Sequence, residues 1–184
     1  SQETVPSSGW KIEKVSDRKV RDEWKPLWGK RAVVEDHFNE LVIDLVNPAG
    51  QPERMQLVVR GYNDGFAFCY KIPDGKGPCV NVQSELTAYN FAGDYTAWFY
   101  NGENHNIGPE KLTETDGTRL PVMTVKAGDK HYMAIHEACL ETGAPLVLQS
   151  KGGESLFSVA SKPTSLSPGY TSAWRVVLYG TTPG

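Results

Sequence analysis

The sequence contains many short runs in which apolar and polar side chains alternate. Turn residues separate these runs. Residues 38–46 (FNELVIDLV) form one such run, and residues 54–60 form the next. Residues 47–50 (NPAG) lie between them, and Asn, Pro and Gly favour tight turns. Alternation with a period of two predicts β-strands, and the short connection predicts an antiparallel hairpin.

The same pattern recurs along most of the 184 residues, and no long stretch has the period of an amphipathic helix. We therefore predict an all-β fold of about ten to twelve strands, packed as two antiparallel sheets. The 18 Gly and 12 Pro residues agree with many turns. Further strands are predicted at residues 10–15, 66–70, 84–91, 95–100, 120–125, 129–140, 146–148, 156–160 and 174–179.

Two stretches are predicted to lack regular structure. Pro26 disfavours a helix, so residues 20–28 are interpreted as an irregular or edge segment. Residues 101–119 are polar and are predicted to form one long loop, which in a compact domain is usually functional or mobile. No internal boundary is evident, so residues 1–184 are expected to form a single β-sandwich domain, with a frayed tail at 1–9 and the start of a linker at 181–184.

Composition and charge argue against several classes of partner. The net charge is −3 and there is no basic block, which argues against a nucleic-acid partner. No apolar run approaches the ~18 residues that a membrane-spanning helix needs. Cys69, Cys79 and Cys139 leave at least one thiol unpaired, and no CxxC pair supports a zinc site. A chain that starts at Ser1 fits either a mature exported protein or a piece of a longer one.

The stretch of residues 129–140 (DKHYMAIHEACL) carries the most unusual side chain. If it is a strand, Glu137 shares one face with Met133 and Ile135, whereas His136 lies on the other face. A carboxylate in an apolar row needs a partner, because burying it unpaired costs several kcal/mol, on the order of the stability of a small domain. That partner is a basic side chain, backbone N–H groups, a metal ion or water; the spacing alone does not decide among them.

Other signs of chemistry are weaker. His131 and His136 are separated by an odd number of residues, so on a strand they face opposite sides and form no metal pair. The nucleophile, phosphate-loop and zinc-protease motifs do not occur. Trp24, Trp28 and Trp98 are candidate platforms for stacking a sugar ring, although packing against the protein is the favoured explanation for Trp24 and Trp28.

Six segments together resemble the N-terminal domain of glycoside hydrolase family 97, a bacterial α-glucosidase and α-galactosidase family. They occur in the family's order, and Cys69 stands where the family usually has Arg. The segments are 24–29 (WKPLWG), 37–41 (HFNEL), 60–68 (RGYNDGFAF), 84–87 (SELT), 135–138 (IHEA) and 173–177 (AWRVV).

This resemblance implies an antiparallel β-supersandwich of the galactose mutarotase type, without long helices. It also implies a C-terminal (β/α)₈ catalytic domain as partner, an α-glucoside or α-galactoside as substrate, and a periplasmic or extracellular location in a bacterium. The catalytic carboxylates would lie in the barrel, so this chain alone is expected to be inactive.

The resemblance further implies a Ca²⁺ ion bound only with the catalytic domain present. Glu137 is the expected ligand from this chain, with Glu110 as the alternative, and the isolated chain is expected to bind Ca²⁺ weakly or not at all. Glu110, Trp98 and His136 are the residues expected to face the sugar. Two other functions stay open: a stand-alone carbohydrate-binding sandwich, and a docking module without a ligand.

Overall fold

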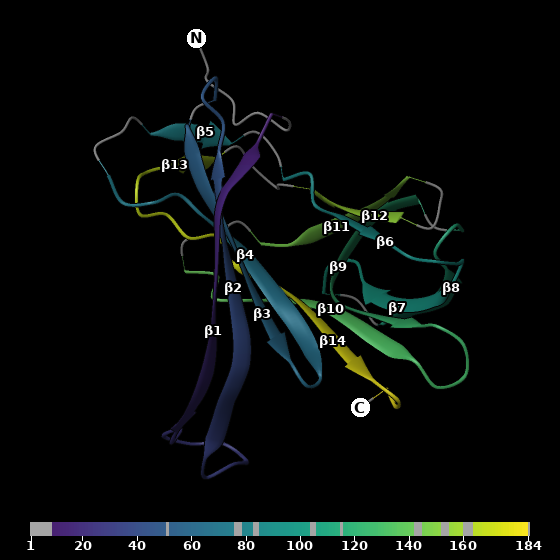
Figure 1. The fold of residues 1–184 in the computed structure, drawn as a ribbon. Helices are drawn as coiled ribbons and strands as arrows, with labels where there is room; N and C mark the ends of the chain where they lie inside the picture. The colour runs from purple at the N-terminus through teal and green to yellow at the C-terminus, as the bar shows by residue number, and fades with distance from the viewer. Residues whose placement is uncertain are drawn as a thin grey trace.

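The computed structural model describes residues 9–50, 52–75, 79–82, 85–103, 106–114, 116–141, 145–151, 155–159 and 164–183. Over these ranges the chain forms strands β1 to β14 and no helix (Figure 1). None of the described segments is therefore a helix that could span a membrane. All the strand pairings are antiparallel, and the prediction of an all-β antiparallel sandwich is confirmed.

The strands in chain order are β1 (Lys11–Trp24), β2 (Val34–Val46), β3 (Arg54–Tyr62), β4 (Gly65–Lys71), β5 (Val80–Val82), β6 (Ala88–Asn90), β7 (Thr96–Tyr100), β8 (Ile107–Lys111), β9 (Asp116–Lys126), β10 (Tyr132–Ala138), β11 (Val147–Lys151), β12 (Ser155–Val159), β13 (Thr164–Leu166) and β14 (Trp174–Gly180). Their spatial order is β1-β2-β3-β4-β14-β10-β9-β11-β12-β6, with β7 and β8 added beside β9 and a separate pair β13-β5.

Strand β9 connects the two layers of the sandwich because its two halves have different neighbours. Residues 116–119 pair with β11, whereas the second half pairs with β7 and β10. The sheet therefore changes layer along β9, and Figure 1 shows β11, β12 and β6 above β7 and β10. The fully apolar core lies between these layers: Ala97, Phe99, Leu112, Met123, Val125, Ile135, Leu146 and Leu148.

The alternation observed in the sequence determines which side chains enter this core. On β10, Ile135 is buried and faces the core, whereas His136 is exposed on the other side of the sheet. We call the side with Ile135, Glu137 and Arg175 the inner face, and the side with His136 and Trp174 the outer face. The cross-strand register places Arg175 beside Glu137, and Trp174 beside Ala138.

The β2–β3 hairpin also forms as expected. The N–H of Asn47 donates to the carbonyl of Glu53 (2.8 Å), and the N–H of Gly50 donates to the carbonyl of Asn47 (2.9 Å). These bonds close the turn, and the resulting register places Glu40 opposite Arg60. On the far side of β2, Glu40 is opposite Arg18 of β1, so three strands contribute one charged row on the outer face.

Two stretches predicted to be irregular are largely strand, which corrects the prediction. Strand β1 runs without interruption to Trp24, because Pro26 lies beyond the strand end in the connection to β2. Inside the predicted 101–119 loop, β8 forms a hairpin with β7, and β9 already begins at Asp116. Strand β8 pairs with β7 alone, and an edge strand tolerates a proline such as Pro109, which has no N–H to donate.

Other predicted boundaries differ as well. The predicted 84–91 strand is reduced to β6, and residues 85–87 belong to no strand; residues 83, 84 and 160 lie outside the described ranges. The short strands β5 and β13 were not predicted, because three-residue strands carry too little alternation to be recognised. Residues 1–8 of the predicted tail at 1–9 also lie outside the described residues.

Candidate functional site

The inner face carries a buried polar network centred on Arg175. The Nη1 of Arg175 lies 3.4 Å from Oε2 of Glu137. Its Nε and Nη2 contact Oε1 and Oε2 of Glu85 at 3.1 and 2.5 Å, which is a bidentate pair. The side chains of Arg175, Glu137 and Glu85 are 4%, 10% and 17% exposed. The backbone N–H of Leu146 also donates to Oε2 of Glu137.

The network continues from Glu85 to β4 through two hydroxyls. Thr87 donates its hydroxyl to Glu85 (2.9 Å) and lies 3.0 Å from the hydroxyl of Tyr70. Burial raises the pKa of Tyr70. Burial alone would lower the pKa of Arg175, but the hydrogen bonds and charge of Glu85 outweigh it and the pKa is raised. Arg175 is therefore a permanent cation shared by two carboxylates.

Glu137 thus has two of the partners that its position requires, a basic side chain and a backbone N–H. The described residues contain no group of three His, Cys, Asp or Glu side chains placed to hold a metal ion. Ca²⁺ takes six to eight oxygen ligands, whereas here a guanidinium lies beside the two nearest carboxylates. Taken alone, the described part of the chain does not fit a Ca²⁺ ion.

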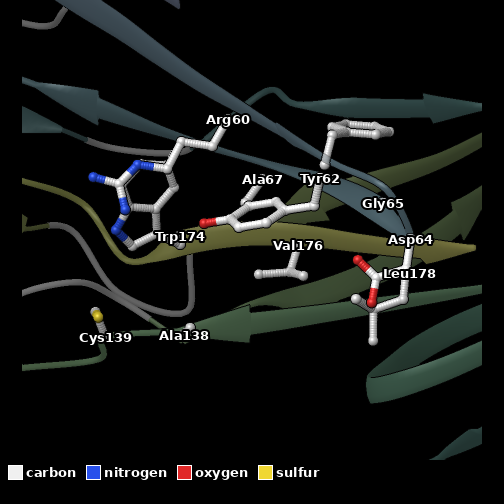
Figure 2. A pocket seen from close by; sticks show the side chains of 11 residues that line it. Arg60, Tyr62, Asp64, Gly65, Ala67, Ala138, Cys139, Trp174, Val176 and Leu178 are labelled. Carbon is white, nitrogen blue, oxygen red and sulfur yellow. The ribbon is translucent and has the colours of Figure 1, made fainter. Parts of the chain in front are cut away.

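On the outer face, an open cavity lies where β3, β4, β10 and β14 meet (Figure 2). Arg60 lies at one end, with its guanidinium carbon 4.2 Å from the ring centre of Phe38 and 4.5 Å from that of Trp174. Figure 2 shows the ring of Tyr62 extending between Trp174 and Asp64. The cavity and the Arg175 network are thus on opposite sides of the same sheet.

Comparison with known proteins identifies the family. The family model described as "Glycosyl-hydrolase 97 N-terminal" matches residues 3–184. This chain belongs to the glycoside hydrolase family 97 N-terminal domains. The family predicted from the six segments is therefore confirmed.

Several larger enzymes of known structure contain a domain with the same fold. One is a family 97 enzyme from Pseudoalteromonas sp. strain K8 in complex with acarbose, with a TM-score of 0.83 and 24% identity, covering 96% of this chain and 28% of that one. Its E480Q form in complex with panose matches equally. A β-arabinopyranosidase has a TM-score of 0.76 and 16% identity, covering 94% of this chain and 32% of that one. The chain thus spans about a third or less of the length of these enzymes.

The four candidate site residues of this family 97 domain do not lie together. Glu137 is on the inner face and His136 on the outer face of β10. Trp98 is half-buried on β7, and its neighbour Ala97 pairs with Glu110 of β8. Oε2 of Glu110 is buried and has no hydrogen-bond partner among the described residues. Of the other proposed platforms, Trp24 is exposed and Trp28 is 86% exposed near the tip of the β1–β2 hairpin.

Arg60, Tyr62 and Trp174 were not predicted to form a site. They come from β3 and β14, which are far apart in the sequence, and no local motif connects them. Two signals were available: the alternation, which places Arg60 and Tyr62 on one face of the same strand, and the family segments 60–68 and 173–177, which contain all three residues.

We expect the Glu40 ion pairs to make the stability of this domain depend on pH. Burial would raise the pKa of Glu40, but hydrogen bonds from Arg18 (2.6 Å) and Arg60 (2.8 Å) outweigh it, so the pKa is lowered. A lowered folded-state pKa gives stability that is present above the unfolded value of about 4.3 and is lost as pH falls through the folded value.

Urea titrations from pH 7 to pH 3 should therefore show a smaller acid-induced loss for Glu40→Gln than for the parent chain. At pH 7 the same substitution should lower the free energy of unfolding by about 1–3 kcal/mol, as expected for hydrogen bonds to charged groups. Glu35→Gln, at an exposed position on the same strand, is the matched control. Parallel pH curves for the parent and Glu40→Gln would contradict the assignment.

Proposed function

We propose that this chain is the non-catalytic N-terminal domain of an exo-acting α-glycoside hydrolase, and that it shapes the sugar pocket of an adjoining (β/α)₈ catalytic domain. The observation that carries the proposal is the family match over residues 3–184, together with the 28% coverage of an acarbose-bound family 97 enzyme. An α-glucoside or α-galactoside is the proposed substrate class. The proposed location is the periplasm or the exterior of a bacterium.

The gene sequence beyond Gly184 tests this role directly. A continuation of about 250 residues with alternating strand and helix patterns would support a (β/α)₈ barrel. The full-length product should then hydrolyse p-nitrophenyl α-glucoside or α-galactoside, and residues 1–184 alone should not. A stop codon directly after Gly184, or hydrolysis by the isolated chain, would contradict the proposal.

The proposal includes Glu137 as one ligand of a Ca²⁺ ion completed by the catalytic domain. For the ion to reach this carboxylate, Arg175 would have to leave its 3.4 Å contact with Glu137. The bidentate contact with Glu85 is the closer of the two and would retain the guanidinium. Glu137 is therefore the carboxylate of the network that could be given up to a cation. Glu110 is the alternative, since one of its carboxylate oxygens has no hydrogen-bond partner among the described residues.

Isothermal titration calorimetry of residues 1–184 with CaCl₂ is expected to show no saturable uptake below the millimolar range. The physical reason is that one carboxylate leaves most of the six to eight oxygen positions to water. In the full-length enzyme, Glu137→Gln should weaken Ca²⁺ binding, whereas Glu141→Gln at an exposed position nearby should not. Tight stoichiometric uptake by the isolated chain, or an unchanged affinity in Glu137→Gln, would contradict the assignment.

A further inference from the structure

The outer-face cavity has the size and lining of a small-molecule site. Its volume is about 340 Å³, and its walls are mainly apolar. Ligand pockets usually measure 300–1,000 Å³ and combine apolar walls with a few polar groups. The volume is at the small end of that range, which suits one ring rather than a chain of several. Its lining comes from four strands, the β3–β4 turn and the residue after β10: Arg60, Tyr62, Asp64, Gly65, Phe66, Ala67, Ala138, Cys139, Trp174, Val176 and Leu178.

Polar groups stand at the two ends of the cavity, and an aromatic ring lies between them. Figure 2 shows Arg60 and Trp174 at one end, the carboxylate of Asp64 at the other, and the ring of Tyr62 in the middle. Phe38 packs against Tyr62 with ring centres 5.5 Å apart, which restricts the orientation of the tyrosine ring. Arg60 is held between two rings and by Glu40, so its orientation is fixed.

The charges around the cavity indicate a neutral ligand. Arg60 shares Glu40 with Arg18. With Asp64 at the other end of the cavity, the two guanidinium groups and the two carboxylates balance, so the site does not require an anion. Asp64 at the opposite end disfavours an anion, and the guanidinium of Arg60 disfavours a cation. A neutral ring with one apolar C–H face and hydroxyls around its edge matches this cavity, which has an aromatic side chain in the middle and polar groups at both ends.

We propose that this cavity is a sugar-binding site in which a neutral pyranose ring stacks on Tyr62 and its hydroxyls meet Asp64 and Arg60. The site does not depend on the proposed Ca²⁺ ligand or on the catalytic domain, because it lies on the opposite face from Glu137 and is formed by this chain alone. Its test therefore uses residues 1–184 and stands or fails separately from the proposed function.

The cysteines provide a direct test, since Cys139 lines the cavity and is exposed. Cys79 is also exposed but does not line it, and Cys69 is buried with its pKa raised by burial to about 11, so it should not react. Maltose or methyl α-glucopyranoside should slow alkylation of Cys139 by iodoacetamide several-fold, measured by peptide mass spectrometry. Labelling of Cys79 should not change. No slowing at Cys139, or equal slowing at both cysteines, would overturn the proposal.

Paired variants test whether the sugar contacts the ring of Tyr62. Titration by ¹H–¹⁵N NMR should show that Tyr62→Leu weakens maltose binding by about tenfold, whereas Tyr62→Phe, which keeps the ring, changes it by less than about threefold. Asp64→Asn, at an exposed turn position, should weaken binding by about threefold or more without affecting folding. Trp28→Ala should leave binding unchanged. Loss of binding in Trp28→Ala with retention in Tyr62→Leu would move the site to the hairpin tip and overturn the proposal.

Discussion

Replacing Arg175 with Met is expected to lower the free energy of unfolding by about 3–5 kcal/mol. The substitution keeps most of the side-chain volume but removes the cation shared by Glu85 and Glu137. Both carboxylates would remain largely buried without a counter-charge, and that, rather than the loss of a contact, is the source of the penalty. Urea denaturation followed by tryptophan fluorescence measures the effect.

Two further variants separate charge from packing. Adding Glu85→Gln and Glu137→Gln to Arg175→Met removes the uncompensated charges and should restore at least half of the lost stability. Arg54→Met is the matched control, because Arg54 forms an exposed ion pair with Glu13, and exposed pairs contribute about 0–1 kcal/mol. If Arg175→Met were no more destabilising than Arg54→Met, the network would not hold the sheet together.

Replacing Leu148 with Ala is expected to destabilise the domain by about 3–5 kcal/mol. Leu148 on β11 is 0% exposed and belongs to the core between the two layers. The loss combines the transfer free energy of the removed methyl and methylene groups with the cavity that they leave. Because β11 pairs with the first half of β9, where the sheet changes layer, we expect the unfolding midpoint to fall without a second transition.

Two control substitutions, one conservative and one at an exposed position, show how much of the stability loss in Leu148→Ala comes from the core. Leu148→Met conserves volume and should cost less than about 1.5 kcal/mol. Leu27→Ala removes a fully exposed side chain and should change stability by no more than about 0.5 kcal/mol. A loss in Leu148→Ala as small as that in Leu27→Ala would mean that the two layers are not packed through this core.

Much of the fold could be predicted because strand alternation and turn chemistry are local properties. Burial of Ile135 and exposure of His136 follow from the period of two, and the NPAG turn sets the β2–β3 hairpin. The prediction from sequence was wrong at strands that pair with only one neighbouring strand. The loop predicted at 101–119 contains β8, whose pairing depends on β7 and is not visible in its own residues.

That Glu137 lies in an apolar row and needs a partner follows from the chain alone, because it requires only the period-two alternation and the free-energy penalty for a buried charge. The identity of those partners, Arg175 and the N–H of Leu146, comes from the folded arrangement, because packing over the whole sheet sets which strands become neighbours. The outer cavity arises in the same way. Tyr62 and Trp174 meet there because β4 alone separates β3 from β14, an order that no single stretch of the chain encodes.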